Sequence, residues 1–226
     1  MVITLDGPAG AGKSTVARAL ARRLSCLYLD TGAMYRALTV KALERGISLD
    51  DSRAIGDLAA STEIRLVPDP DAMRVTVDGE DVTQLIRSPE VSRSVSYVAR
   101  VPDVRAGMVL LQRKLGEGGC VVAEGRDMGT VVFPRADLKI YLEASPRERA
   151  RRRAQDLAGA GHAVDVQVLE AEIRQRDHLD STRDVAPMEA ATDAVRLVTD
   201  DLTADQVVDR ILDLLRETGG PRRTGG

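Results

Sequence analysis

Eight residues near the start of the chain constrain its fold most: Gly7 to Ser14 read GPAGAGKS, which fits the pattern G-x-x-x-x-G-K-[ST]. Residues 2–5 before it are apolar and β-branched, as a buried strand requires, and residues 15–24 after it repeat apolar side chains at helical spacing. A glycine-rich loop between a strand and a helix lets backbone N–H groups converge on phosphate oxygens. The sequence therefore predicts a site for a nucleoside triphosphate.

Two side chains of this loop are candidates for contact with the phosphates and their metal ion. The motif predicts that Lys13 reaches the β- and γ-phosphates and that the Ser14 hydroxyl ligates Mg²⁺. The start of the helix adds its partial positive charge. A glycine-rich turn that merely starts a helix is the structural alternative, which the flanking strand and helix disfavour. The triphosphate is expected at Gly7, Pro8, Ala9, Gly10, Ala11, Gly12, Lys13, Ser14 and Thr15.

The composition narrows the class of protein. With 226 residues, the chain is long enough for one α/β domain with inserts, whose core is stable without disulfides or bound metals. Its net charge of −3 argues against a general nucleic-acid binder, and with no Trp and one Phe it lacks aromatic platforms for stacking bases. The absence of Asn rules out the Asn-Lys-x-Asp motif with which GTPases read guanine.

Further expectations concern the surroundings of the chain. Met1 leads straight into the first strand and no apolar stretch approaches the length of a membrane span, so we expect no secretory signal and no membrane partner. Cys26 and Cys120 each lie beside an apolar run and are predicted to be buried free thiols. We expect a cytoplasmic enzyme, and a monomer because no long uncovered apolar stripe is evident.

The pattern along the chain predicts an α/β fold in which a five-stranded parallel sheet is covered by helices on both faces. The expected strands are residues 2–5, 27–29, 120–123, 138–142 and 195–199, and the expected helices include 15–24, 33–44 and 203–215. Thr203 is the predicted cap of the last helix. We assign residues 1–216 to a single domain and 217–226 to a disordered tail.

Two segments interrupt the alternation of strands and helices. Residues 64–67 and 74–77 alternate apolar and polar side chains with period two, which predicts a small antiparallel insert within about residues 60–98. Residues 145–161 are rich in arginine and end in Gly159-x-Gly161, which is typical of a mobile lid with a hinge.

Three further strings carry a family resemblance. Residues 30–36 read DTGAMYR, residues 125–134 read GRDMGTVVFP, and residues 176–183 read RDHLDSTR. Together with the phosphate loop, in this order and at this spacing, they closely resemble bacterial cytidylate kinases over about residues 2–216. The resemblance implies a P-loop kinase that uses Mg²⁺ and transfers a phosphoryl group from ATP to CMP or dCMP, with a nucleotide-binding insert and a lid.

The chemistry of such a reaction agrees with the residues present. The acceptor oxygen of a nucleoside monophosphate is already anionic near pH 7, because the second pKa of a phosphomonoester is about 6. Phosphoryl transfer to this oxygen therefore needs no general base. It needs cations that hold two anionic groups in line. The sequence offers arginines at loop positions, whereas His162 and His178 are isolated.

The resemblance also implies roles for individual residues. Lys13, Arg36, Arg126 and Arg183 are the implied catalytic cations, Glu124 would hold the Mg²⁺ hydration shell through water, and Arg151 of the lid would bind ATP. Asp127 would accept from the cytosine amino group, with Ser96 and Arg105 on the rest of the base edge. The implied acceptor site comprises Thr31, Tyr35, Arg36, Ser96, Arg105, Gly125, Arg126, Asp127, Arg176, Asp180 and Arg183.

Each of these roles has a structural alternative that involves no ligand. Taken alone, Arg36 and Arg105 are compatible with solvated helix faces, Asp127 with a turn cap, and the lid arginines with a charged surface. Among functions, a P-loop kinase of a small hydroxylated metabolite, similar to shikimate or gluconate kinases, is the runner-up, with Asp30 orienting a hydroxyl. A nucleotide-binding switch without turnover is the third possibility, and the missing guanine motif argues against it.

Overall fold

The computed structural model describes residues 1–67, 73–159 and 165–217. Its centre is a five-stranded sheet in the order β2-β6-β1-β7-β8, and every pair of neighbours is parallel. The strands are β1 (Val2–Asp6), β2 (Leu27–Asp30), β6 (Val121–Glu124), β7 (Leu138–Glu143) and β8 (Val195–Val198). The prediction of five parallel strands is confirmed, and each predicted end lies within one residue of the observed one.

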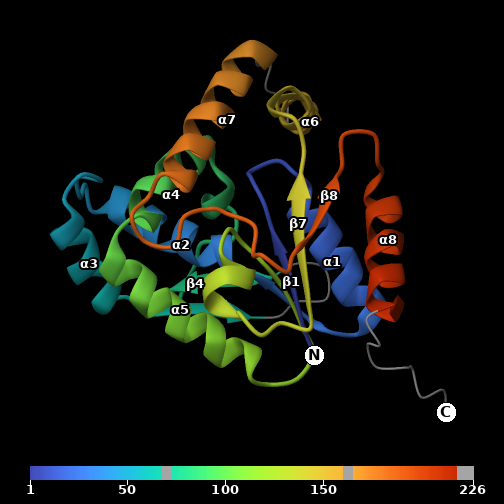
Figure 1. The fold of residues 1–226 in the computed structure, drawn as a ribbon. Coiled ribbons are helices and arrows are strands. Elements are labelled where there is room, and N and C mark those ends of the chain that lie inside the picture. Colours follow the sequence, from blue (N-terminus) through green and yellow to red (C-terminus); the bar gives the residue numbers. More distant parts are fainter. Residues whose placement is uncertain (68–72, 160–164, 218–226) are drawn as a thin grey trace.

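Helices cover both faces of this sheet (Figure 1). Helices α1 (Lys13–Leu24) and α8 (Ala204–Glu217) pack on one face against side chains such as Ile3 and Val122. Because side chains alternate along a strand, Val121 and Ala123 point to the opposite face. On that side lie α2 (Thr31–Glu44), α3 (Ser52–Ala60), α4 (Pro89–Ala99) and α5 (Pro102–Gly116).

The predicted cap of the last helix is confirmed. The Gln206 backbone N–H donates to the Thr203 hydroxyl at 3.3 Å, and the Thr203 backbone N–H donates to the Gln206 side chain at 2.8 Å. This reciprocal pair satisfies two N–H groups at the helix start.

A second, antiparallel sheet is formed by β3 (Ile64–Val67), β4 (Arg74–Val77) and β5 (Glu80–Asp81). The turn between β4 and β5 holds Asp78 and Gly79 at φ 49° and 89°, the left-handed conformations that a two-residue hairpin turn requires. The predicted antiparallel strands are confirmed. The sheet contributes Ile64, Val75 and Val77 to the core around α2.

Helices α6 (Pro146–Gly159) and α7 (Val166–Ser181) lie side by side beyond the carboxyl edge of the sheet (Figure 1). Ala150, Leu169 and Ile173 form their shared apolar contact. The predicted hinge falls partly, and the predicted disordered tail almost wholly, outside the described residues. No helix within the described ranges is long and apolar enough to cross a membrane.

The prediction of buried free thiols is wrong, because Cys26 and Cys120 form a disulfide and both are only half-buried. Each cysteine directly precedes a strand, β2 or β6, and these strands are neighbours with Leu27 opposite Val121. The Leu27 N–H also donates to the Cys120 carbonyl at 2.8 Å. The two Cα atoms consequently lie 4.7 Å apart, within the range that a disulfide spans.

Candidate active site

The carboxyl ends of three neighbouring strands bring acidic side chains to one edge of the sheet. Asp6 ends β1, Asp30 ends β2 and Glu124 ends β6, and all three are buried. Ligands of open α/β sheets bind at this edge. The phosphate loop follows β1 directly, so it lies at the middle of the sheet beside these carboxylates.

Backbone conformation explains the glycines of the loop. Gly7 has φ 138°, and a Cβ there would lie 2.2 Å from the Leu142 carbonyl oxygen on β7. Gly10 has φ 80°, and a Cβ there would lie 3.1 Å from the Cβ of Arg149 on α6. The loop is therefore shaped between β7 and α6 in a way that side chains would prevent.

Lys13 is buried at the start of α1. Its Nζ donates to the Pro8 carbonyl at 2.7 Å. Burial, and then the positive charge of Arg126, lower the pKa of Lys13 well below its usual value. A ligand with negative charge would relieve both effects, so this site favours an anion.

Glu124 lies within reach of the loop and has the chemistry of a magnesium site. It is 4% exposed and accepts a hydrogen bond from the Tyr28 hydroxyl at 2.5 Å, and the Ser14 side chain lies near it. Burial, followed by the charge of Asp30, raises the pKa of Glu124. Ser14 and Glu124 offer the hard oxygen donors that Mg²⁺ prefers. Within the described part of the chain no group of three or more His, Cys, Asp or Glu side chains could hold a metal. This donor set fits an ion bound mainly by phosphates and water.

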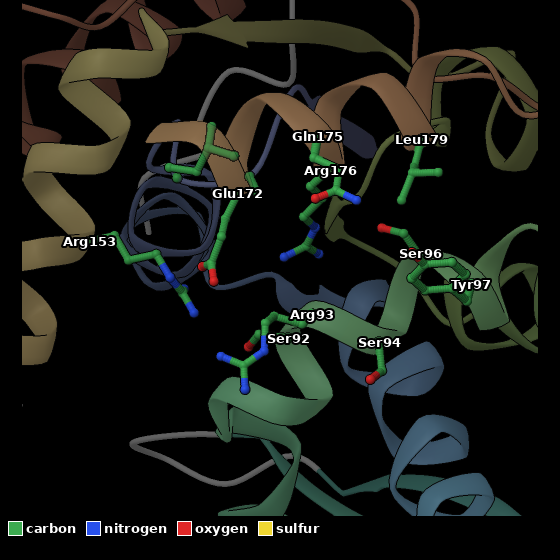
Figure 2. A pocket seen from close by; sticks show the side chains of 13 residues that line it. Ser92, Arg93, Ser94, Ser96, Tyr97, Arg153, Glu172, Gln175, Arg176 and Leu179 are labelled. Carbon is green, nitrogen blue, oxygen red and sulfur yellow. The ribbon is translucent and has the colours of Figure 1, made fainter. Parts of the chain in front are cut away.

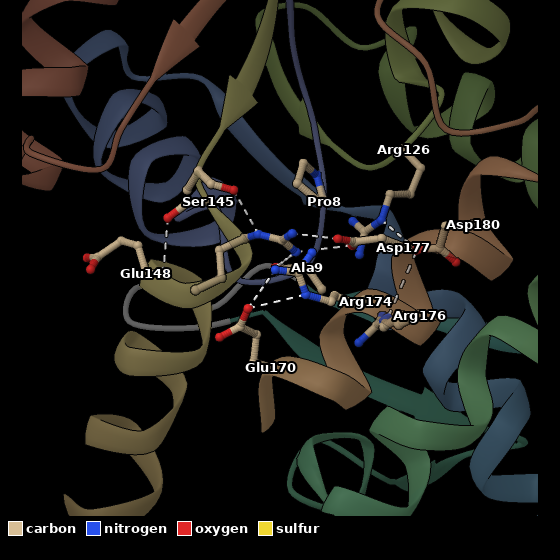
Figure 3. A network of polar contacts seen from close by, with 12 residues as sticks. Pro8, Ala9, Arg126, Ser145, Glu148, Glu170, Arg174, Arg176, Asp177 and Asp180 are labelled. Carbon is tan, nitrogen blue, oxygen red and sulfur yellow. Dashed lines mark hydrogen bonds and ion pairs between the residues drawn. The ribbon is translucent and has the colours of Figure 1, made fainter. Parts of the chain in front are cut away.

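A second group of residues joins the loop after β6 to α7. The Nε of Arg126 and the hydroxyl of Ser96 donate to the two carboxylate oxygens of Asp180, at 2.9 and 2.8 Å. The Nε of Arg176 lies 4.0 Å from the same carboxylate (Figure 3). Burial lowers the pKa of Arg176 to about 10, and repulsion from Arg126 contributes. These guanidinium groups form a concentrated positive region.

Asp127 lies at the base of the site between two buried arginines. The Nη2 of Arg105 donates to its Oδ2, and the Nη2 of Arg183 lies 3.6 Å from its Oδ1. All three side chains are at most 4% exposed. The Nε of Arg105 and the Nη2 of Arg183 are buried without a hydrogen-bond partner. Unpaired buried donors beside a carboxylate are suited to a polar ligand.

The structure brings every residue predicted for the acceptor to one cavity of about 60 Å³. Its lining includes Thr31, Tyr35, Arg36, Ser96, Arg105, Gly125, Arg126, Asp127, Arg176, Asp180 and Arg183. A larger cavity of about 350 Å³ shares Ser96 and Arg176 with it and extends to Ala9 and Gly10 of the phosphate loop. Figure 2 shows Ser96 and Arg176 facing each other across this larger space.

The binding of ATP by Arg151 of the lid stays a prediction. Arg151 pairs with Glu148 at 2.7 Å and its side chain is 53% exposed. Two contacts of the same helix were not predicted. The Nη1 of Arg149 donates to the Ala9 carbonyl at 3.0 Å, and the Nη1 of Arg152 donates to the Thr199 hydroxyl at 3.2 Å. Five arginines in seven residues carry no signal of which ones face the loop, because that depends on where α6 packs.

The contacts of Asp6 and Asp177 were not predicted either. Asp6 accepts from the N–H groups of Met128 and Gly129, both at 2.8 Å, and so shapes the turn after Asp127. Asp177 accepts from Arg149 at 3.1 Å. The Asp6 position, directly before the phosphate loop, was the one signal available in the sequence.

A phosphate loop after the central strand of a five-stranded parallel sheet, with a cation-lined cleft at the carboxyl edge, defines the fold of a P-loop kinase. The fold resembles shikimate kinase from Bacteroides thetaiotaomicron, with a TM-score of 0.50 at 16% identity over 96% of this chain and 98% of that chain. A family model described as cytidylate kinase matches residues 3–217, and the chain belongs to this family.

Curated relatives are of two lengths. The cytidylate kinase of Geobacillus thermodenitrificans (strain NG80-2) is 50% identical over 218 residues, which are 96% of this chain and 97% of that protein. The bifunctional pantoate ligase/cytidylate kinase of Synechocystis sp. (strain ATCC 27184 / PCC 6803 / Kazusa) is 52% identical over 96% of this chain and 43% of that protein. The chain thus spans less than half the length of its bifunctional relatives.

Proposed function

We propose that the protein transfers the γ-phosphoryl group of ATP to CMP or dCMP, giving ADP and CDP or dCDP. The observation that carries this proposal is the buried Asp127 held between Arg105 and Arg183 in the cavity lined by the predicted acceptor residues. The names of the curated relatives support the same activity. In this proposal residues 60–98 bind the acceptor nucleotide and residues 145–161 act as the lid.

The donors and acceptors of the cavity match the edge of cytosine. Cytosine has an N4–H₂ donor and acceptors at N3 and O2. Asp127 accepts from the amino group, and Arg105 donates to N3 or O2. Ser96 and Asp180 are joined by a hydrogen bond of 2.8 Å, and Asp180 accepts from a sugar hydroxyl that CMP and dCMP share. The site therefore admits both sugars.

The phosphates are held by cations rather than by acid–base groups. Arg36 and Arg126 bind the acceptor phosphate, whose oxygen is already ionised near pH 7. Lys13 follows the transferred phosphoryl group, where negative charge develops. Ser14, and Glu124 through water, would hold Mg²⁺, which would neutralise part of the phosphate charge.

The alternative of a metabolite kinase depends on Asp30 as the group that orients a hydroxyl. The Asp30 carboxylate accepts from the Ala33 N–H at 2.9 Å and pairs with Arg36 at 2.8 Å. Because Asp30 caps α2 and pairs with Arg36, its position is explained without a role as a base. The likeness to shikimate kinase concerns the fold alone.

An ADP-release assay with a panel of acceptors tests the proposal. We expect turnover with CMP and dCMP, weak turnover with UMP, and negligible turnover with AMP, shikimate and gluconate. Turnover with shikimate or gluconate alone would indicate a metabolite kinase instead. ATP binding without turnover on any acceptor would favour a nucleotide-binding switch.

We further propose that the protein is a cytoplasmic monomer with no nucleic-acid or membrane partner.

A further inference from the structure

Tyr28 has no place in the reaction proposed above, yet its hydroxyl makes a short contact within the phosphate-loop region. It donates to Oε1 of Glu124 at 2.5 Å. The hydroxyl is the donor of this pair and the carboxylate oxygen is the acceptor.

The register of the sheet explains why these two side chains meet. Tyr28 on β2 lies opposite Val122 on β6, and Glu124 follows Val122 by two residues. Because successive side chains alternate between the faces of a sheet, Glu124 points to the same face as Val122. Tyr28 packs beside Val122 in the core beneath α1. The phenol therefore reaches Glu124 diagonally across two hydrogen-bonded strands.

Helix α1 restrains the same pair from above. Its residue Arg18 places a guanidinium carbon 5.5 Å from the centroid of the Tyr28 ring. The first turn of the same helix brings the Ser14 side chain near Glu124. Tyr28 and Ser14 thus approach Glu124 from two elements, the sheet and the helix. An ionised carboxylate has about four lone-pair positions, so acceptor capacity remains for water bound to a metal.

We propose that Tyr28 is a positioning residue for the metal site: its hydroxyl fixes the rotation of the Glu124 carboxylate, the group that would hold the hydration shell of Mg²⁺. This inference rests on the proposed role of Glu124 in holding Mg²⁺. Partners that orient a metal-binding group through a second hydrogen bond typically affect metal affinity by about 10- to 100-fold.

The test is direct binding of Mn²⁺, used as a probe for Mg²⁺, to the protein in complex with a non-hydrolysable ATP analogue, followed by electron paramagnetic resonance. Tyr28→Phe removes the hydroxyl and keeps the ring beneath Arg18. We expect Mn²⁺ to bind about tenfold more weakly, with the KM for CMP unchanged. Tyr141→Phe, a strand tyrosine whose ring also lies beneath an arginine, is the matched control and should bind Mn²⁺ as the wild type does.

A double variant distinguishes positioning from general damage to the sheet. With Glu124→Gln already present, Tyr28→Phe should weaken Mn²⁺ binding no further. Wild-type Mn²⁺ affinity in Tyr28→Phe would overturn the inference, as would an equal loss in the Glu124→Gln background. Unchanged affinity in Glu124→Gln alone would remove the metal role of Glu124 and this inference with it. The choice of CMP as acceptor is tested separately by the acceptor panel.

Discussion

Arg126 donates through Nε to Oδ2 of Asp180 at 2.9 Å, and this bond ties the loop after β6 to helix α7. Burial alone would raise the pKa of Asp180, but Arg126 and then Arg176 reverse the effect and lower it. The ionised carboxylate therefore holds two guanidinium groups near each other that would otherwise separate. A phosphate bound beside them would add the negative charge that this region lacks.

The first prediction concerns the acceptor phosphate. Arg36→Ala should raise the KM for CMP about tenfold or more, because a charged hydrogen bond contributes about 1.5–3 kcal/mol, and should change the KM for ATP less. Steady-state kinetics with each substrate varied in turn measure both constants. Arg45→Ala, an exposed position just beyond the end of the same helix, is the control and should leave both unchanged. An equal rise in the two KM values would argue against a specific role at the acceptor.

The second prediction concerns base selection. Asp127→Asn replaces an acceptor oxygen by an amide group that can donate. It should therefore lower kcat/KM for CMP and reduce the ratio of kcat/KM for CMP to kcat/KM for UMP. Uracil carries a carbonyl at position 4 and a donor at N3, and it mismatches both Asp127 and Arg105 in the wild type. Such a mismatch costs about 1–3 kcal/mol for each buried group left unpaired. If the ratio of kcat/KM for CMP to kcat/KM for UMP equals that of the wild type, Asp127 does not select the base.

The strand–loop–helix unit and the five core strands could be predicted because each is encoded locally, by an apolar run that ends at a glycine or an acidic residue. The acceptor residues came from the family resemblance, and the cavity that gathers them required the fold. The neighbours of a strand could not be predicted, because β6 lies between β2 and β1 only through long crossover connections. That order is what joins Cys26 to Cys120 and Tyr28 to Glu124.

The third prediction uses the disulfide. It links residues 94 positions apart, and a disulfide typically stabilises a fold by about 2–4 kcal/mol because it restricts the unfolded chain. Cys120→Ser should lower the free energy of unfolding by about this amount while leaving CMP turnover intact, since the bridge lies at the edge of the sheet opposite the site. A reductant should destabilise the wild type equally and have no effect on Cys120→Ser. A wild type whose urea midpoint is insensitive to reductant would show that the bridge contributes no stability.

The fourth prediction follows from Asp6. Burial raises its pKa from 3.8 to about 6, although the N–H groups of Gly129 and Met128 favour the charged form. Because the pKa is higher in the folded protein than in the unfolded chain, the contribution of Asp6 to stability is greatest below pH 4 and is lost as the pH rises through 6. About two pKa units correspond to about 3 kcal/mol.

Urea unfolding of the wild type and of Asp6→Asn at pH 4 and pH 7 measures this effect. The stability of the wild type relative to Asp6→Asn should be greater at pH 4 than at pH 7 by up to about 3 kcal/mol. Other titrating groups cancel in the comparison because both proteins carry them. A stability difference that is the same at the two pH values, or larger at pH 7, would refute the raised pKa.

The most direct test of cytosine recognition is a crystal structure of the protein with CMP bound. We expect the cytosine N4 within hydrogen-bond distance of the Asp127 carboxylate, Arg105 donating to N3 or O2, and the phosphate in contact with Arg36 and Arg126. CMP bound with its base away from Asp127, or with its phosphate away from both arginines, would contradict it.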